Sequence, residues 1–257
     1  MSTMEIDRQR VTLREGETVL QTARRHGFDV PTLCHHEALE PVGACRLCLV
    51  EVWLPGWSAA EPGKLVASCL YPSSPGLVVA TGSDRVRATR KTVFELLLAR
   101  APRSRELVEL AARHGVVGTP YPPTDAPDDC ILCGQCTRIC ELLGHTAIAT
   151  VGRGVVKEVA PPLRKPPLAC VGCGACARVC PTRTIPMVET ATSREIWGRV
   201  FELVPCEVCG KRHLTREQIT FFSARTGLDG SYFRTCDDCS RKETVARLAA
   251  QVWAGQE

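Results

Sequence analysis

Short runs of alternating apolar and polar residues open the chain and predict paired strands followed by a helix. Residues 4–6 and 11–13 alternate on either side of a polar stretch, which is typical of a β-hairpin. Thr18 and Gln21 then have the spacing of a capping box, with apolar residues behind them. The pattern predicts a short helix that begins after Thr18 and ends at Gly27.

Three further runs, rich in β-branched and apolar residues, predict strands after this helix. They cover residues 47–53, 64–67 and 77–80, and residues 55–63 predict an extended loop between the first two. A hairpin, a helix and then more strands is the element order of a β-grasp domain. We therefore expect residues 1–82 to form a β-grasp domain.

Helical periodicity replaces alternation in the next segment. Apolar residues recur at helical spacing over residues 84–100, and a second short helix is expected over residues 104–114. Residues 116–129 are rich in proline and predict a linker. We expect residues 83–129 to form a helical bridge between two larger units.

The second half of the chain predicts one hairpin and two helices. Residues 146–151 and 155–159 flank a Gly-Arg-Gly turn and predict a β-hairpin. The pair Thr215/Gln218 has capping-box spacing and predicts a helix that runs to about residue 225. The pair Ser240/Glu243 has the same spacing and predicts a second helix through Val252.

Sixteen cysteines fall into four groups of four, with none left over. Four cysteines are what an iron–sulfur cluster or a structural zinc ion requires. No secretory signal follows Met1, and cysteines this dense in a reducing compartment indicate metal ligands in preference to disulfides. The groups are Cys34, Cys45, Cys48 and Cys69; Cys130, Cys133, Cys136 and Cys140; Cys170, Cys173, Cys176 and Cys180; and Cys206, Cys209, Cys236 and Cys239.

Two of these groups repeat one spacing. Residues 130–140 and 170–180 both read C-x2-C-x2-C-x3-C, the pattern of bacterial two-cluster ferredoxins. In that pattern the fourth cysteine of each run binds the other cluster, so the ligand sets cross over. We expect a dicluster domain over residues 130–190. One [4Fe–4S] cluster is expected on Cys130, Cys133, Cys136 and Cys180, and a second on Cys140, Cys170, Cys173 and Cys176.

The two runs differ in one detail and match in another. Cys140 is followed by Glu141 where the pattern has proline, which loosens the turn without removing a ligand. Arg138 and Arg178 occupy matching positions, two residues before the fourth cysteine of each run. Three roles stay open for Arg178: tuning a potential, facing a partner or lying in solvent.

The first cysteine group has a different spacing, C-x10-C-x2-C-x20-C. Pro-Thr-Leu-Cys34-His, and then Gly43-Ala-Cys45-Arg-Leu-Cys48-Leu-Val-Glu-Val, closely resemble the N-terminal [2Fe–2S] domain of the large iron–sulfur subunit of respiratory complex I. The same domain opens the small diaphorase-type subunit of NAD-linked nickel–iron hydrogenases, iron-only hydrogenases and some formate dehydrogenases. The resemblance implies a [2Fe–2S] cluster on Cys34, Cys45, Cys48 and Cys69.

Two alternatives to that ligand set stay open. Zinc is one of them, although zinc sites usually pair two CxxC knuckles and this group has a single one. Ligation by the neighbouring residues His35 and His36 is the other alternative.

The resemblance breaks off within residues 70–129, which contain no cysteine. Complex I and hydrogenase relatives usually carry a [4Fe–4S] site of one histidine and three cysteines here, whereas this segment has His114 alone. We expect that cluster to be absent and its helices to remain as spacers. The route from the [2Fe–2S] centre to the next cluster stays open, and one arrangement places the [2Fe–2S] centre at a branch.

The last group consists of two CxxC knuckles, Cys206/Cys209 and Cys236/Cys239, which lie 26 residues apart. Two knuckles around an insert suit a tetrahedral zinc site. The run Cys-x-x-Cys-Gly-Lys at residues 206–211 also resembles the zinc-ribbon tails of ferredoxin-like hydrogenase subunits. A third [4Fe–4S] cluster is the alternative. Residues 191–257 are expected to form this four-cysteine C-terminal domain.

Several classes of function are excluded by the remaining sequence features. No apolar run approaches the roughly 18 residues that a membrane span needs, so we expect a cytoplasmic protein. The net charge of +4 comes without a block of Lys and Arg interleaved with aromatic residues, which argues against nucleic-acid binding. No phosphate-binding glycine loop and no acid–base pair stands out, so no catalytic centre is evident.

These features predict an α+β chain that moves electrons. The fold class is a β-grasp [2Fe–2S] domain, a short helical bridge, a bacterial 2[4Fe–4S] ferredoxin-like domain and a small helical, zinc-ribbon-like C-terminal domain. The resemblance implies an electron-transfer subunit of a multi-subunit oxidoreductase, with one [2Fe–2S], two [4Fe–4S] and one zinc or third [4Fe–4S]. It implies as partners a flavin/NAD(P)-binding subunit, a hydrogenase catalytic subunit and ferredoxin, with electron bifurcation left open. A formate dehydrogenase complex and a free ferredoxin-like carrier are the alternatives.

Overall fold

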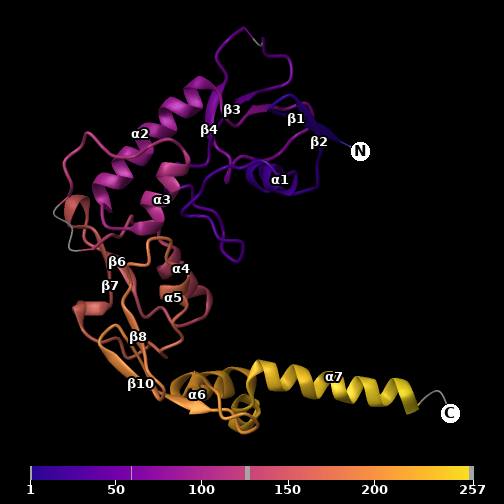
Figure 1. Cartoon of the computed structure of the whole chain (residues 1–257), viewed down its shortest axis with the longest axis vertical. Coiled ribbons are helices and arrows are strands. Elements are labelled where there is room, and N and C mark those ends of the chain that lie inside the picture. The colour runs from indigo at the N-terminus through magenta and orange to yellow at the C-terminus, as the bar shows by residue number, and fades with distance from the viewer. Residues whose placement is uncertain (1, 59, 125–127, 255–257) are drawn as a thin grey trace.

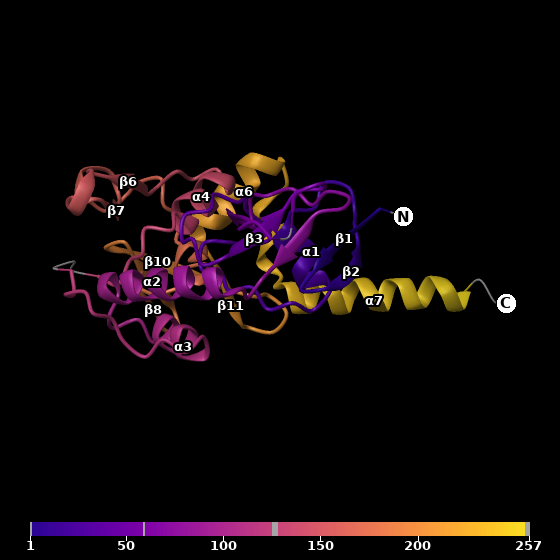
Figure 2. The ribbon, with the colours of Figure 1, turned by 90° about the horizontal axis from the view of Figure 1, so that it is seen from above.

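A computed structural model describes residues 2–58, 60–124 and 128–254 of the chain. Figure 1 shows the chain as a column of units, with the N-terminal sheet at one end and the last helix projecting sideways at the other. Figure 2, seen from above, shows the same helix extending beyond the other elements. Among the described helices, none is both long and apolar enough to cross a lipid bilayer.

The N-terminal unit is a five-stranded sheet with one helix against it, in the strand order β2-β1-β5-β3-β4. β1 and β5 are parallel, and the other neighbouring strands are antiparallel. The hairpin, the helix and the later strands all form where the hydrophobic pattern predicts them. The elements are β1 (Thr3–Ile6), β2 (Gln9–Thr12), α1 (Val19–Arg25), β3 (Leu49–Trp53), β4 (Lys64–Ala67) and β5 (Val78–Ala80).

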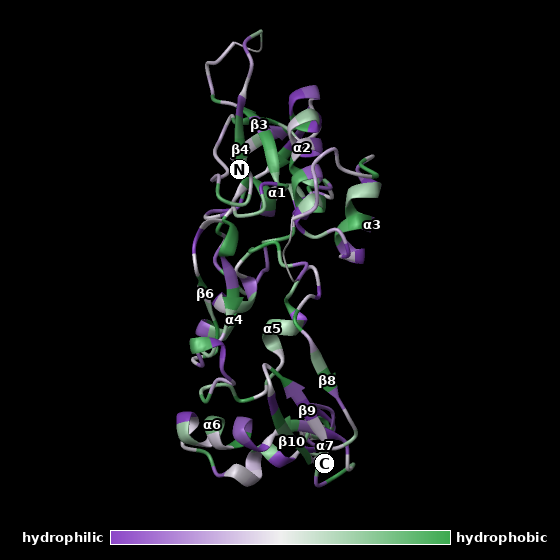
Figure 3. Ribbon diagram, turned by 90° about the vertical axis from the view of Figure 1, so that its left-hand side faces the viewer, coloured by the Kyte–Doolittle hydropathy of each residue, from purple (hydrophilic) through white to green (hydrophobic). Residues whose placement is uncertain are grey.

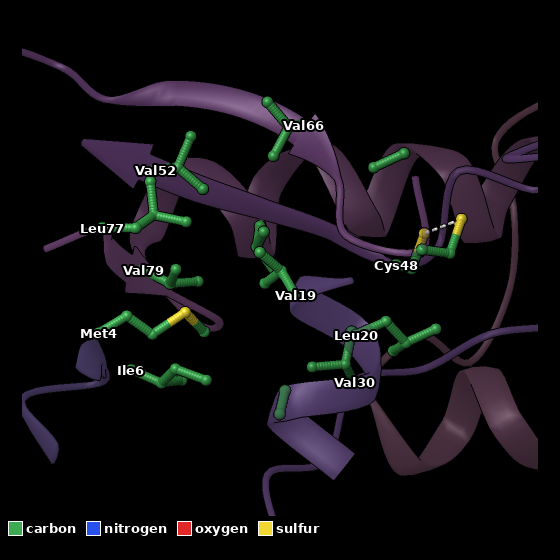
Figure 4. Packing of buried hydrophobic residues seen from close by; sticks show 14 of the residues in the cluster. Met4, Ile6, Val19, Leu20, Val30, Cys48, Val52, Val66, Leu77 and Val79 are labelled. Carbon is green, nitrogen blue, oxygen red and sulfur yellow. Dashed lines mark hydrogen bonds between the residues drawn. The ribbon is translucent and has the colours of Figure 1, made fainter. Parts of the chain in front are cut away.

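Helix α1 closes the core of this unit. Its capping box forms as predicted, because the Thr18 side chain accepts from the Gln21 N–H and the Gln21 side chain accepts from the Thr18 N–H. Val19 and Leu20 are fully buried against the strands (Figure 4), and each contributes about 2 kcal/mol of burial free energy. Figure 3 shows the apolar residues concentrated along β3, which runs through this core.

The bridge consists of α2 (Asp84–Arg100) and α3 (Arg105–Arg113), as the helical periodicity predicts. Ser83 and Ser104 cap them by accepting hydrogen bonds from backbone N–H groups of the first turn. Both helices pack on a second core that also contains the loops of the first two cysteine sites. Its buried members are Leu33, Cys34, Cys45, Leu47, Phe94, Leu98, Ala101, Leu107, Ala111, Val116 and Cys133.

The dicluster segment contains two short helices and one small hairpin. The elements are α4 (Gln135–Leu142), β6 (Ala149–Val151), η1 (Gly154–Val156), β7 (Glu158–Ala160), η2 (Pro162–Arg164) and α5 (Ala175–Arg178). The predicted hairpin forms, but its second strand begins at Glu158, because residues 154–156 form a 3₁₀ turn. Val155 and Val156, counted as strand residues in the prediction, are exposed there.

The C-terminal segment contains a four-stranded antiparallel sheet, in the order β11-β10-β9-β8. None of these strands is among the elements predicted from the sequence. The sheet starts within the predicted dicluster domain, since β8 precedes residue 190 and pairs with β9 behind it. The elements are β8 (Met187–Glu189), β9 (Ser193–Ile196), β10 (Arg199–Pro205), β11 (Arg212–Thr215), α6 (Arg216–Thr226), η3 (Gly230–Arg234) and α7 (Asp237–Ala254).

One of the two predicted helix starts in this segment is confirmed and the other is wrong. Thr215 and Gln218 form the capping box of α6. Helix α7 begins at Asp237, so Ser240 lies inside its first turn and does not cap it. The Ser240 N–H donates to the carbonyl of Cys236 at 2.9 Å, which is a bond of the helical ladder. The last cysteine knuckle therefore opens the helix.

Candidate metal centres

The cysteines of the first group form two close pairs in the interior. All four are at most 6% exposed. The Sγ atoms of Cys48 and Cys69 lie 3.4 Å apart, and the Cys45 N–H donates to Cys34 Sγ at 3.4 Å. Two thiol pairs in one loop region match a cluster with two metal ions and four thiolate ligands.

Close pairing and backbone donors favour thiolate formation at this site. The hydrogen bond from Cys34 lowers the pKa of the Cys45 thiol to about 6, and that from Cys69 lowers the pKa of Cys48 to about 7. The pKa of each partner thiol is raised, because that thiol keeps the shared proton. The Leu33 N–H also donates to Cys45 Sγ at 3.5 Å. Thiolates are the metal-binding form, so the donor set fits a metal cofactor.

Gly43 allows the loop of the first group to close. Its φ is +62°, and a Cβ atom built there would lie 2.6 Å from Leu70 Cδ1. The buried Arg90 of α2 also stabilises the loop of the first group through hydrogen bonds to its backbone. It donates to the carbonyl oxygens of Leu47 and Leu49, on either side of Cys48, at 3.0 and 2.8 Å.

The two repeated cysteine runs line two separate cavities, and the grouping crosses between the runs. Cys130, Cys133 and Cys136 line a cavity of about 170 Å³ together with Cys180 from the other run. A second, smaller cavity is lined by Cys140, Cys170, Cys173 and Cys176. The structure thus brings together the two four-cysteine sets that the crossover pattern predicts.

The repeated loops share backbone geometry. The Leu132 N–H donates to Cys130 Sγ, and the Gly172 N–H donates to Cys170 Sγ, each at 3.4 Å. Gly134 and Gly174 precede their helices with φ of +71° and +72°. Burial raises the pKa of the Cys133 and Cys176 thiols to about 11. Burial therefore keeps these thiols protonated until a metal ion displaces the proton and binds the thiolate.

The two runs differ in local structure after their fourth cysteine, where Glu141 follows Cys140 and Pro181 follows Cys180. Helix α4 continues past Cys140 to Leu142, whereas α5 ends at Arg178, before Cys180 and Pro181. Cys140 still faces its cavity and accepts a hydrogen bond from the Ala147 N–H at 3.3 Å. The missing proline therefore lengthens one helix and leaves the cysteine in place.

The hairpin β9–β10 covers the loop of the second cavity and was not foreseen. Arg194 Nη1 donates to Gly172 O at 2.8 Å, and Arg199 Nη1 donates to Cys170 O at 2.6 Å. Between them, Trp197 Nε1 donates to Cys176 Sγ at 3.4 Å. The alternating pattern of residues 199–205 was the signal for this strand, since it buries Phe201 and Leu203 and exposes their neighbours.

The matching arginines have different surroundings. Arg138 donates to the carbonyl oxygen of Cys34 at 3.2 Å and also to that of Glu40, which ties α4 to the first cysteine loop. Arg178 is more exposed and reaches the carbonyl of Cys173 in its own loop at 3.4 Å. Gln135 adds a second bond of α4 to the first loop, from its side-chain amide to Leu33 O.

The last cysteine group has the most compact geometry. The four Sγ atoms of Cys206, Cys209, Cys236 and Cys239 all lie within 4.8 Å of one another. Cys209 and Cys236 are 3.7 Å apart. Tetrahedral zinc–thiolate bonds of about 2.3 Å place their sulfurs about 3.8 Å apart, so a single ion fits this site. The Cys236 N–H donates to Cys206 Sγ at 3.3 Å and lowers the pKa of Cys206 to about 6.

Family models match both kinds of cysteine site. Residues 1–84 match a family described as a 2Fe-2S iron-sulfur cluster binding domain. Residues 165–185 match a 4Fe-4S binding domain. The second match covers the loop of the second cavity, from before Cys170 to beyond Cys180.

Solved and curated relatives agree with these matches. One chain of the crystal structure of an NAD+-reducing [NiFe]-hydrogenase in the H2-reduced state is 30% identical, with a TM-score of 0.54. The alignment covers 62% of this chain and 74% of that chain. The chain belongs to the family of iron–sulfur subunits found in NAD-linked hydrogenases and complex I. The resemblance inferred from the residues around Cys34, Cys45 and Cys48 is thereby confirmed.

Two curated members of this family illustrate its range. The NADP-reducing hydrogenase subunit HndD of Solidesulfovibrio fructosivorans is 32% identical over 190 residues, 63% of this chain and 31% of that protein. The mitochondrial NADH-ubiquinone oxidoreductase 78 kDa subunit of Candida albicans is 31% identical over 176 residues, 58% of this chain and 23% of that protein. The chain thus spans a third or less of the length of these relatives.

Three histidines near the first two cysteine groups make contacts with protein groups. His35 Nδ1 lies 3.4 Å from Arg24 Nη1, and His36 Nδ1 accepts from the Ala38 N–H. His114 stacks on Phe94 at 5.4 Å between ring centroids, within the second core. All sixteen cysteines lie in the described part of the chain, and all are free of disulfides.

Proposed function

We propose that this chain is an electron-transfer subunit that relays electrons between a flavin/NAD(P)-binding subunit and a hydrogenase catalytic subunit. The clusters, when bound, supply one-electron redox chemistry. Cys34, Cys45, Cys48 and Cys69 hold a [2Fe–2S] cluster. The first [4Fe–4S] cluster is held by Cys130, Cys133, Cys136 and Cys180, and the second by Cys140, Cys170, Cys173 and Cys176.

Direct packing between the first two sites carries this proposal. Cys133 of the first dicluster cavity shares one buried core with Cys34 and Cys45. Gln135 and Arg138 bond the backbone of the same loop at Leu33 and Cys34. A chain that lacks the histidine-and-three-cysteine site therefore keeps an unbroken row of cysteine sites. This contact supports a straight route through the [2Fe–2S] centre and disfavours a branch.

The C-terminal group is proposed as a structural zinc site. Its sulfur separations suit one tetrahedral ion, whereas a cubane cluster between the four sulfurs would hold them farther apart. A zinc ion has no redox chemistry, so the electron route ends at the second [4Fe–4S] cluster. The four-cysteine domain then stabilises the C-terminal sheet and presents α7 to a partner.

The identity of the catalytic partner rests on the relatives alone. A hydrogenase is favoured because HndD and the matched crystal structure are both described as hydrogenases. A formate dehydrogenase complex is the second candidate, and a free ferredoxin-like carrier is the third. A reducing cytoplasm is the proposed compartment because it keeps sixteen thiols available for metal. Co-purification of a tagged chain separates a stable complex from a free carrier.

Metal content tests the proposal directly. Anaerobically purified protein should contain about ten iron atoms, about ten inorganic sulfides and about one zinc ion per chain. Reduction should give one EPR signal that persists at higher temperature, from the [2Fe–2S] cluster, and faster-relaxing signals from the others. An iron content of about fourteen atoms per chain without zinc would indicate a third [4Fe–4S] cluster at the C-terminal group. The electron route would then extend to that group. Zinc in all sites would refute electron transfer.

A further inference from the structure

The turn between β9 and β10 holds a bulky residue in an unfavourable conformation. Ile196 pairs with Arg199 across the ladder, so Trp197 and Gly198 form a two-residue hairpin loop. Their φ angles are +55° and +72°, as a type I′ turn requires. Asparagine, aspartate or glycine normally occupies such positions, because a large side chain is disfavoured at positive φ. Strained residues of this kind cluster at functional sites.

The strained residue lies where the two dicluster cavities approach each other. Trp197 lines the cavity of Cys130, Cys133, Cys136 and Cys180 and also the cavity of Cys140, Cys170, Cys173 and Cys176. Its indole Nε1–H donates to Cys176 Sγ at 3.4 Å. The neighbouring residues Arg194 and Arg199 anchor the hairpin to the loop carbonyls of Gly172 and Cys170. The hairpin therefore holds one side-chain N–H against a ligand sulfur.

We propose that Trp197 sets the midpoint potential of the second [4Fe–4S] cluster relative to the first. The inference rests on the proposed function, because it needs both clusters in place. Reduction adds one negative charge to a cluster, and part of that charge resides on the ligand sulfurs. An N–H donor at Cys176 stabilises this charge, so it raises the potential of the cluster. Electrons then favour the second cluster, at the C-terminal end of the row.

Thr182 provides a comparison at the first cluster, because its hydroxyl can donate to Cys180 Sγ once that sulfur is a metal-bound thiolate. Thr182 Oγ1 lies 3.6 Å from Cys180 Sγ and is buried in the cavity of the first cluster. This longer contact is made by a hydroxyl group, and a Thr182→Val substitution keeps its shape. The two donors thus act on different clusters, and each can be removed without removing a cysteine.

The experiment is an EPR-monitored redox titration of the full chain, reconstituted and checked for iron content. Trp197→Phe keeps an aromatic ring and removes the N–H. Trp57→Phe is the matched control, because Trp57 lies in an exposed loop of the N-terminal unit. Thr182→Val reports on the other cluster. The [2Fe–2S] signal serves as an internal reference in every sample.

Trp197→Phe should move one low-temperature [4Fe–4S] wave to more negative potential and leave the other wave and the [2Fe–2S] wave in place. A tenfold loss in the preference of an electron for the second cluster corresponds to about 59 mV for a one-electron couple. Thr182→Val should move the other wave, and Trp57→Phe should move none. A Trp197→Phe titration that coincides with the wild-type curve would overturn the proposal.

A second measurement needs no substitution at Trp197, in case that variant loses a cluster. Wild-type protein grown with ¹⁵N-indole tryptophan should show a pulsed-EPR coupling between one indole nitrogen and a reduced [4Fe–4S] signal. The coupling should survive Trp57→Phe. Reduced clusters without any indole coupling would refute the role of Trp197 while leaving the electron-transfer function intact. Protein that binds no iron at all would instead refute the proposed function.

Discussion

At the scale of single residues, the ion pairs of this chain differ in the number of hydrogen bonds that support them. Arg25 binds Glu17 through two bonds of 2.8 and 2.6 Å and also donates to Thr12 O. The bond to Thr12 ties α1 to the first hairpin. Thr22 adds a further hydrogen bond to the same carboxylate. The contacts hold the pKa of Glu17 below its usual 4.5, with the Arg25 hydrogen bond as the largest cause.

Glu17→Gln should therefore destabilise the N-terminal unit by about 1 kcal/mol at neutral pH, because it removes a carboxylate with charged and neutral donors. A carboxylate whose pKa is lower in the folded state stabilises the fold at pH values above its unfolded-state pKa. This stabilisation is lost as the pH falls through the folded-state pKa. The difference between wild type and variant should thus shrink below about pH 4.5. Denaturant titrations at several pH values measure this difference in the free energy of unfolding.

The exposed pair of Arg105 and Glu109 provides the control for this prediction. It has one bond of 2.6 Å between side chains that are 85% and 59% exposed. Glu109→Gln should change the denaturation midpoint far less than Glu17→Gln at every pH. Equal effects from the two substitutions would show that the partly buried hydrogen-bond network around Glu17 adds no stability.

Gly172 is the residue whose replacement should be most specific for one cluster. Its φ is +68°, and a Cβ atom there would lie 2.5 Å from the Phe201 ring. Gly172→Ala should push the loop of Cys170 and Cys173 away from β10, with a loss of about four iron atoms per chain. Gly16→Ala is the control, since Gly16 also has positive φ but no atom within 4 Å of the added Cβ. The measurement is the iron content per chain of both variants. A Gly172→Ala variant with the full iron content would contradict the prediction.

At the scale of elements, the sequence predicted those parts whose signals are local. Capping at Thr18 and Thr215 depends on residues three apart, and both helices start where expected. The cysteine spacing likewise predicted which thiols meet around each cavity. The Ser240/Glu243 pair has the same local signal, but Cys236 must reach Cys206. The helix that follows Cys236 begins at Asp237, so Ser240 falls inside it.

The contacts that could not be predicted join residues far apart in the chain. Trp197 meets Cys176 only because β9 and β10 fold back over the loop of the second cavity. Arg138 and Arg178 look equivalent in the sequence, yet only Arg138 faces the N-terminal unit. The repeated cysteine spacing predicts the loops around both cavities. It does not predict which of the two repeats contacts the first cysteine group.

Helix α4 should therefore couple two units, and this difference provides a matched test. Arg138→Met removes a charged donor from Cys34 O and Glu40 O, which should weaken the contact by about 2 kcal/mol. Electron transfer between the [2Fe–2S] and first [4Fe–4S] centres should slow with it. Arg178→Met should leave that step unchanged, because Arg178 bonds within its own loop. Flash reduction followed by optical and EPR detection measures the rate. Equal rates in the two variants would contradict this role of α4.

At the scale of the whole molecule, loss of the metal at the proposed zinc site should affect the C-terminal structure and leave electron transfer intact. Cys209→Ser removes the most exposed ligand of the last group. About one zinc ion per chain should be lost, and the start of α7 should become sensitive to protease. The three cluster EPR signals should persist with unchanged intensity. Cys133→Ser is the contrasting variant, since it should cost iron and leave zinc in place. Loss of cluster signals in Cys209→Ser with zinc retained would contradict the assignment.

In the proposed arrangement, three redox centres lie in one continuous row, with the [2Fe–2S] site packed directly on the first [4Fe–4S] site. The most direct test is the spin relaxation of the [2Fe–2S] signal in the full chain, measured by pulsed EPR as the potential is lowered. We expect its relaxation to accelerate when the neighbouring [4Fe–4S] cluster becomes reduced and paramagnetic. A [2Fe–2S] signal whose relaxation stays constant while both [4Fe–4S] clusters are reduced would contradict it.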